Sequence, residues 1–246
     1  MRRSAKEFVE RWGRRMEMDE GERLAFHNDA KNRYATVLEL VPPRARRILD
    51  VGAGSGLLSF LLGKWCRCEV EALDFFPVRR RWAGEEVRVR RCDVERERFP
   101  FPDESFDCVV CSEVLEHLLH SPHHMLEESR RVLREGGVLI LTTPNAVKLV
   151  VRLKVLLGKE LCHYRSFYAS PPPDRHHKEY TLSEVRELLL EHGFRVERIF
   201  CRNTTSWRGP SRYASPGRRL LMDLLLAATH LWPTFKELIF ARAEKP

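Results

Sequence analysis

The stretch ILDVGAGSG, from Ile48 to Gly56, is the part of the sequence that indicates the fold most strongly. Its apolar start is typical of a short buried strand, and glycines follow at every second position: Gly52, Gly54 and Gly56. Glycine lets the backbone turn sharply and lets a ligand approach the main chain closely. The apolar residues from Leu57 to Trp65 then predict a helix, whose first N–H groups lack helical partners and can bind a ligand.

The spacing of these glycines is G-x-G-x-G, which differs from the G-x-G-x-x-G pattern of dinucleotide-binding proteins. A loop of this kind by itself could be a tight turn without a ligand. Two acidic residues favour the interpretation that the loop binds a nucleoside. Asp74 ends the strand-like run EVEALD, where a carboxylate can accept both ribose hydroxyls, and Asp93 follows the run VRVRRC, where it could meet an adenine amino group.

Strand-like and helix-like runs alternate along the rest of the chain. This alternation predicts an α/β fold with a doubly wound, seven-stranded, mostly parallel sheet of the Rossmann-like kind. We expect strands at RILDV, EVEALD, VRVRRCD, SFDCVVCS, VLILTT, FRVERIF and ELIFARAE. We expect helices at 57–65, 77–83, 123–133, 149–158 and 182–193, the last opened by the capping-box pattern Thr181-x-x-Glu184.

Three parts of the chain lie outside this alternation. Residues 1–45 predict an N-terminal helical cap, so the main α/β domain would occupy 46–246. Two helical inserts interrupt that domain, at about 146–175 and 201–234. The second insert contains LLMDLLLAATHLW (220–232), a helix that could line an apolar pocket, pack on the sheet or in a dimer, or lie on a membrane surface.

Five segments resemble, in order, the motifs of class I S-adenosylmethionine-dependent methyltransferases. They are ILDVGAGSG, LDFFP, RCDVERERFPFPDESFDCVVCSEVLEHL, RRVLREGGVLILTTPN and HHKEYTLSEVRELLLEHGF. The resemblance is to the broad group that includes the ubiquinone-biosynthesis O-methyltransferases. It covers roughly residues 46–200 and the last strand, and it implies a methyltransferase domain with S-adenosyl-L-methionine as cofactor.

The resemblance also implies cofactor roles for individual residues. Gly52, Gly54 and Gly56 would line the methionine part, and Asp50 would orient its amino group. Asp74 would hold the ribose and Phe75 would pack on the adenine. The remaining positions would frame the adenine edge or border the sulfonium: Cys92, Asp93 and Val94 for the first, Ser112 and Glu113 for the second.

Methyl transfer to a hydroxyl needs a group that accepts its proton, and two clusters could supply one. The first is Glu113-Val-Leu-Glu116-His117, and the second contains His176. We expect His117 and His176 to be the proton acceptors, because imidazole titrates near neutrality. The alternative is a divalent metal held by the carboxylates and imidazoles, since the pattern resembles a set used by small-RNA 2′-O-methyltransferases and some quinone O-methyltransferases.

The composition limits the kinds of binding partner and cellular compartment that we expect. The net charge of +8 favours acidic partners such as RNA or an anionic membrane, or it describes a basic surface without such a partner. No run reaches the roughly 18 apolar residues of a membrane span. The N-terminus has no apolar signal core and the seven cysteines have no disulfide spacing, so we expect a cytoplasmic protein with reduced thiols.

Three functions follow from these observations. The apolar inserts favour methylation of a small or lipid-like acceptor, at oxygen. The charge and the Glu/His pattern favour an RNA ribose 2′-O-methyltransferase, although no RNA-binding module is appended. The third is a non-catalytic relative that keeps the fold as an interaction module. The sequence leaves the acceptor and the oligomeric state open.

Overall fold

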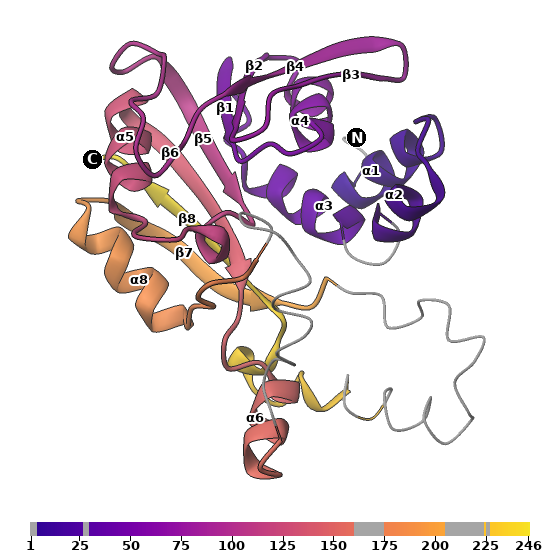
Figure 1. The fold of residues 1–246 in the computed structure, drawn as a ribbon, viewed down its shortest axis with the longest axis vertical. Coiled ribbons are helices and arrows are strands. Elements are labelled where there is room, and N and C mark those ends of the chain that lie inside the picture. The colour runs from indigo at the N-terminus through magenta and orange to yellow at the C-terminus, as the bar shows by residue number, and fades with distance from the viewer. Residues whose placement is uncertain (1–3, 27–29, 160–174, 205–223, 225–226) are drawn as a thin grey trace.

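A computed structural model describes residues 4–26, 30–159, 175–204, 224 and 227–246. Its centre is an eight-stranded sheet with the order β3-β4-β2-β1-β5-β6-β8-β7 (Figure 1). Six strands run in one direction, and they are β1 (Arg47–Val51), β2 (Glu69–Asp74), β4 (Glu85–Arg91), β5 (Phe106–Ser112), β6 (Leu133–Pro144) and β7 (Arg195–Arg202). The strands β3 (Val78–Trp82) and β8 (Leu238–Glu244) run antiparallel to their neighbours. The doubly wound, mostly parallel sheet is confirmed.

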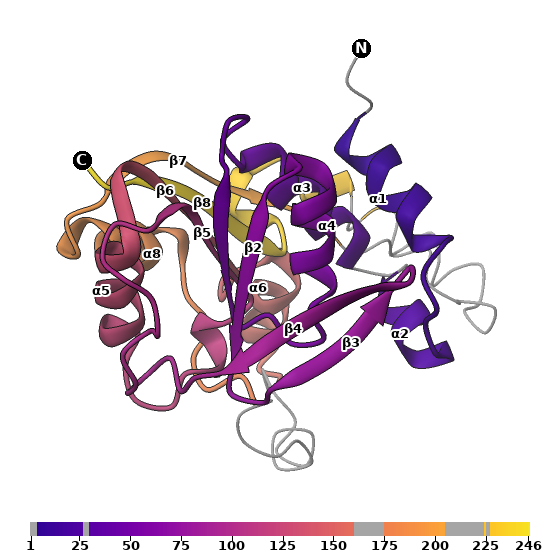
Figure 2. The ribbon, with the colours of Figure 1, turned by 90° about the horizontal axis from the view of Figure 1, so that it is seen from above.

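Helices cover both faces of this sheet (Figure 2). One face carries α1 (Ala5–Gly13), α3 (Lys31–Leu40) and α4 (Leu57–Cys66), and their apolar side chains share one core with the strands. The other face carries α5 (His123–Val132) and α8 (Leu182–Glu191), which pack in a second core. Burial of these apolar faces is the main stabilising term of such a layered fold.

The ends of several helices follow their local sequence. Thr181 and Glu184 form the expected capping box of α8, in which each side chain bonds the backbone N–H of the other residue. The helix α5 begins directly after Ser121-Pro122. The short helix α2 (Glu20–Ala25) has a capping box of its own, between Asp19 and Glu22.

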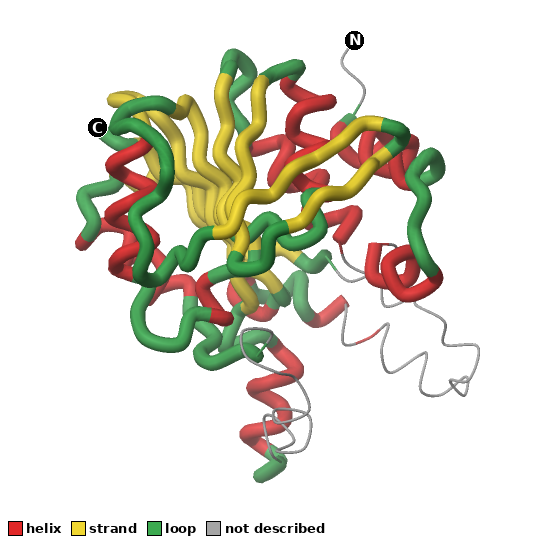
Figure 3. Tube along the Cα trace, turned by 45° about the horizontal axis from the view of Figure 1, so that its top comes forward, coloured by secondary structure: helices red, strands yellow, loops and turns green. Residues whose placement is uncertain are grey.

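The expectation of a helix at 77–83 is wrong. Residues Val78–Trp82 form β3, which pairs with β4 as a hairpin and raises the strand number from seven to eight. The turn explains the difference: Ala83 and Gly84 have φ values of 50° and 84°. Two successive positive φ angles are typical of the type I′ turn, which joins the two strands of a hairpin through a two-residue loop. The hairpin extends beyond the sheet and crosses the N-terminal helices (Figure 3).

The two expected inserts are described in part. In the first, α6 (Leu149–Leu156) is present and projects from the body of the molecule (Figure 1). Residues 160–174 lie outside the described part. The expected helix at 220–232 lies partly outside it. Residues 224, 227 and 228 are helical, but 229–232 form turns and bends, so the expectation that the helix continues to 232 is wrong. Within the described residues, no helix is long and apolar enough to cross a bilayer.

Candidate cofactor and methyl-transfer site

The glycine loop (Gly52–Gly56) is held to the neighbouring strand by main-chain hydrogen bonds. The N–H groups of Gly52 and Ala53 both donate to the carbonyl oxygen of Leu73, at 2.8 and 3.0 Å. Gly52 and Gly54 have φ values of 71° and 52°, which side chains disfavour. A Cβ on Gly52 would come within 2.4 Å of Val114, whereas a Cβ on Gly54 would meet no atom within 4 Å. Gly52 is therefore required by packing, and Gly54 leaves open space for a ligand.

A cavity of about 610 Å³ lies beside this loop, at the carboxyl ends of the parallel strands. Its volume falls in the range of roughly 300–1,000 Å³ that small-molecule sites occupy. Nine of the predicted site residues line it: Gly52, Gly54, Asp74, Phe75, Cys92, Asp93, Val94, Glu113 and His117. The position agrees with the rule that ligands of such sheets bind outside the carboxyl ends of the strands.

Asp74 is oriented toward the cavity by two backbone groups. Its carboxylate accepts hydrogen bonds from the N–H of Gly54 at 2.8 Å and of Phe76 at 3.0 Å. The ring of Phe75 is 44% exposed and contacts Phe76 edge to face. A fixed carboxylate beside an accessible aromatic face suits a ribose and an adenine, so these residues fit an adenosyl group.

The segment after β4 forms the next wall. The side chain of Asp93 accepts a hydrogen bond from the N–H of Glu95 at 3.1 Å. Burial raises the pKa of the Cys92 thiol to about 11, so this thiol is neutral at pH 7. Cys92 therefore contributes an uncharged surface next to the carboxylate of Asp93.

Three predicted cofactor residues lie behind the described lining of the cavity. Asp50 is almost fully buried and accepts a 2.6 Å hydrogen bond from the Ser59 hydroxyl, and burial raises its pKa to about 7. Gly56 caps α4 and packs against Val87. The hydroxyl of Ser112 lies 3.0 Å from that of Thr142. Their contact with a cofactor stays a prediction.

Glu113 borders the cavity in a strained backbone conformation. Its φ is 58°, which is uncommon for a residue with a side chain and costs about 1–3 kcal/mol. Thr142 donates a hydrogen bond to its carboxylate at 2.9 Å, and Arg33 of α3 forms an ion pair with it at 3.1 Å. Strain of this kind is concentrated at functional sites. The carboxylate is thus held in one position at the edge of the cavity.

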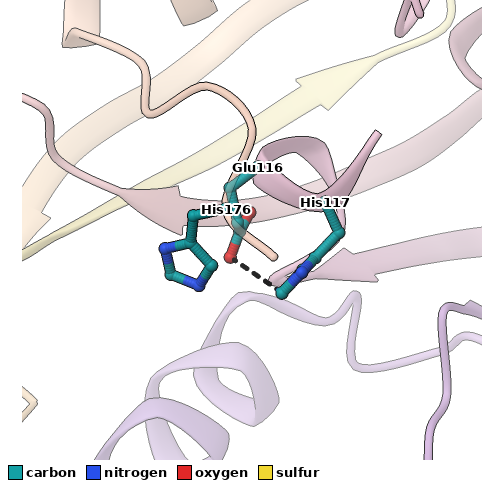
Figure 4. A group of neighbouring side chains, drawn as sticks. All are labelled: Glu116, His117 and His176. Atoms are coloured by element: carbon teal, nitrogen blue, oxygen red, sulfur yellow. Dashed lines mark ion pairs between the residues drawn. The ribbon is translucent and has the colours of Figure 1, made fainter. Parts of the chain in front are cut away.

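Glu116, His117 and His176 form a second group, here named the acid–imidazole cluster, of which His117 lines the cavity. Glu116 and His117 lie on the short helix η2 (Leu115–His117), and His176 comes from the segment before α8. One ligand atom of each lies within 4.8 Å of the others, and the carboxylate lies between the two rings (Figure 4). The structure therefore brings together two histidines that are 59 positions apart.

Hydrogen bonds fix the orientation of the two rings. Nδ1 of His117 lies 3.1 Å from the carbonyl oxygen of Arg175, which can only accept, so Nδ1 carries the proton. Nε2 is then the acceptor nitrogen of the neutral ring, and it lies 3.9 Å from the carboxylate of Glu116. Nδ1 of His176 lies 3.5 Å from the Glu179 carboxylate, and this interaction raises the pKa of His176.

Glu116 is the least exposed member of the cluster. One oxygen accepts a hydrogen bond from Thr143 at 2.9 Å, and the other is buried without a hydrogen-bond partner among the described residues. Burial, followed by the charge of Glu113, raises the pKa of Glu116 to about 8. A buried carboxyl of this kind keeps its proton at neutral pH unless a cation lies beside it.

Several supporting residues were missed by the sequence reasoning. Thr142 and Thr143 end β6 next to β5, so the parallel pairing of these strands could have indicated them. Glu95 accepts hydrogen bonds from three successive N–H groups, those of residues 119–121, and so fixes the loop after η2. Arg33 reaches the site from the N-terminal helices, and no local pattern marks it.

The fold and this site define a class of nucleoside-cofactor-binding domain, and comparisons with known proteins identify it further. Residues 20–199 match the family model described as a methyltransferase domain. The chain is 28% identical to a malonyl-[acyl-carrier protein] O-methyltransferase of a Paenibacillus species, over 75% of this chain and 66% of that protein. It is 29% identical to a ubiquinone biosynthesis O-methyltransferase of Xanthomonas euvesicatoria, over 74% of each chain.

A solved structure supports the fold. A SAM-dependent methyltransferase from Archaeoglobus fulgidus superimposes with a TM-score of 0.58 at 20% identity, over 86% of this chain and 92% of that one. The chain belongs to the methyltransferase domain family, and this membership implies S-adenosylmethionine as its cofactor. The resemblance drawn from the sequence motifs is confirmed.

Proposed function

We propose that this protein transfers a methyl group from S-adenosylmethionine to a hydroxyl oxygen of a small, partly apolar acceptor. The observation that carries the proposal is the His117 ring. Its Nδ1–H is directed to the Arg175 carbonyl, and the residue lines the cavity beside Glu113. Nε2 is thereby left as the acceptor nitrogen of the neutral ring, which is the form that a general base needs.

The residues present fit the cofactor, which supplies a methyl group on a positively charged sulfur. Asp74 would hold the ribose, Phe75 the adenine face and Asp93 with Val94 the adenine edge. The open side of Gly54 lets the methionine part approach the main chain. The fixed carboxylate of Glu113 would lie near the sulfur, where a negative charge is favourable.

His117 would accept the proton of the acceptor hydroxyl through Nε2. The other two members of the cluster act through this ring. Glu116 lies 3.9 Å from Nε2, and the ring of His176 packs edge-on against that of His117 with 4.8 Å between centroids. Their roles are to hold the ring and to adjust its charge, so that transfer of the proton can accompany attack of the oxygen on the methyl group.

The nature of the acceptor is inferred from the lining and from the relatives. Val114, Leu118 and Leu119 line the reacting end of the cavity, which suits an apolar or lipid-like molecule. Both curated relatives described above carry O-methyltransferase in their names. The cysteines in the described part of the chain are free thiols, and we further propose that the protein works in the cytoplasm, where thiols stay reduced. Its substrate there would be a small molecule.

Transfer of a labelled methyl group tests this proposal. The full chain is incubated with S-adenosylmethionine labelled in the methyl group and with separate lipid, small-molecule and RNA fractions. Label in an alkali-stable ether of the lipid or small-molecule fraction supports it. Label in RNA alone, or failure to bind S-adenosylmethionine in calorimetry, contradicts it.

Metal-assisted transfer is the second candidate, and the cluster favours it. The buried Glu116 oxygen and two imidazoles are donor types that a divalent ion of the first transition row accepts. Such an ion would hold the acceptor oxygen and lower its pKa. Complete loss of transfer in EDTA, restored by Mn²⁺, Co²⁺ or Zn²⁺, would assign the cluster to a metal, whereas full activity in EDTA supports His117 as a direct proton acceptor.

A further inference from the structure

The outer face of the β3–β4 hairpin carries an unusual density of positive charge. Alternate side chains of two antiparallel strands point to the same face, and in this register Arg79 lies directly opposite Arg88. Two more arginines lie diagonally beside this pair: Arg90, and Arg81 with Glu86 directly opposite it. All five side chains are exposed. Like charges placed opposite each other in a sheet are destabilising. The protein therefore carries an electrostatic cost that an anionic partner would relieve.

Three other arginines of the hairpin form ion pairs within the protein, so they provide a comparison for Arg79 and Arg88. Arg80 on the inner face pairs with Glu22 of α2, and Arg91 pairs with Glu97 at 2.7 Å. Arg90 pairs with Glu71 at 3.3 Å. Within the described residues, neither Arg79 nor Arg88 forms an ion pair. These two guanidinium groups are available to a ligand.

A groove with a volume of about 400 Å³ lies beside this charged face. It is lined by Pro77, Val78, Arg79, Arg88, Val89, Arg90, Arg91 and Pro100. The planar guanidinium group presents a fork of donors that matches phosphate oxygens. Phosphate is thus the anion that this groove fits best.

An exposed aromatic ring accompanies the arginines. Phe76 lies two residues before the start of β3 and is 54% exposed, although a phenylalanine is normally buried. Proteins that bind single-stranded nucleic acid combine a basic groove along the phosphates with aromatic rings on which bases stack. An acidic polypeptide would use the arginines and would have no need of this ring.

We propose that the outer face of the β3–β4 hairpin, with Phe76, is a binding surface for single-stranded nucleic acid. The arginine pair Arg79–Arg88 holds the phosphates and Phe76 stacks on one base. This surface lies outside the cofactor cavity apart from Phe76. The inference goes beyond the proposed function, because the bound strand need not be the methyl acceptor.

Fluorescence anisotropy of the full chain with a labelled RNA of about 12 nucleotides, within the usual site size, tests the proposal. Arg79→Gln/Arg88→Gln should weaken binding at least about tenfold, and the slope of log affinity against log salt should decrease by about 1.4, which is two phosphate contacts of a single strand. Phe76→Ala should weaken binding by roughly 5- to 100-fold with the salt slope unchanged.

The matched control is Arg44→Gln/Arg186→Gln, which removes the same charge from exposed positions outside the hairpin. It should bind the RNA within about twofold of the original protein if the site is specific. Thermal melting shows that each variant is folded before it is compared. Absence of RNA binding, an equal loss in the control, or competition by polyglutamate together with an unaffected Phe76→Ala variant would each overturn the proposal.

Discussion

The glycine loop and His117 of the acid–imidazole cluster border one cavity, but the loop and the cluster are built in different ways. The loop is a continuous stretch that lines the cavity through Gly52 and Gly54, and its shape is fixed by local φ angles and by the Leu73 carbonyl. The cluster consists of side chains from two distant segments, fixed by Arg175, Thr143 and Glu179. Because the loop and the cluster depend on different contacts, we expect that mutations can alter cofactor binding and proton transfer separately.

The largest effect should come from the cluster. We expect His117→Ala to lower the rate constant of methyl transfer by about 10²- to 10⁴-fold, because a positioned proton acceptor contributes that much. The dissociation constant of S-adenosylmethionine should change less than about threefold, since the adenosyl end of the cavity is untouched. Transfer of labelled methyl under saturating cofactor measures the first quantity, and calorimetry measures the second.

His124→Ala is the matched control for this experiment. Its ring lies on α5, where Nε2 is 3.0 Å from the carbonyl oxygen of Glu97, and it does not line the described cavity. The control should keep its rate. If His117→Ala weakened cofactor binding as much as it slowed transfer, loop and cluster would act as one unit and the separation would be refuted.

The second effect isolates the loop. Gly54→Ala and Gly136→Ala have the same backbone problem, because φ is 52° and 70° and neither added Cβ meets an atom within 4 Å. Both variants should lose about 1–2 kcal/mol of unfolding free energy. Only Gly54→Ala places a methyl group at the cavity, so only it should weaken cofactor binding, by at least about tenfold. Equal cofactor affinity in both variants would show that the ligand does not approach this glycine.

The same contrast explains what the sequence could predict. The loop, Asp74 and the α8 capping box depend on residues close together in the chain, and strand–helix alternation predicted the sheet. The sequence also predicted which residues form the cluster. Its geometry could not be predicted, because it depends on the Arg175 carbonyl and on strand pairing. The first strand of the hairpin, β3, was assigned to a helix because two positive φ angles at Ala83-Gly84 leave little trace in composition, whereas β4 was expected as a strand. The ion pair between Arg33 and Glu113 is a purely tertiary contact.

The smallest expected effect concerns the charge of Glu116. Its pKa is raised from 4.5 to about 8 in the folded protein, so the folded state keeps a proton that the unfolded state releases above about pH 4.5. The stabilisation from this group is therefore complete below pH 4.5 and is lost as the pH rises to about 8. Glu116→Gln removes this titration, and Asp50, whose pKa is also raised, contributes equally to both proteins.

We expect the unfolding free energy of the original protein to fall more steeply than that of Glu116→Gln between about pH 5 and 8.5, by at least about 1.4 kcal/mol, the value of one pKa unit. Urea unfolding at several pH values measures the difference, with the exposed Glu187→Gln as control. Parallel curves would mean that Glu116 is ionised in the folded state, which requires a cation beside it. That cation is either a metal ion or protonated His176, whose pKa is raised. Curves that diverge once EDTA is added would favour the metal-assisted reaction, and curves that stay parallel in EDTA would point to His176.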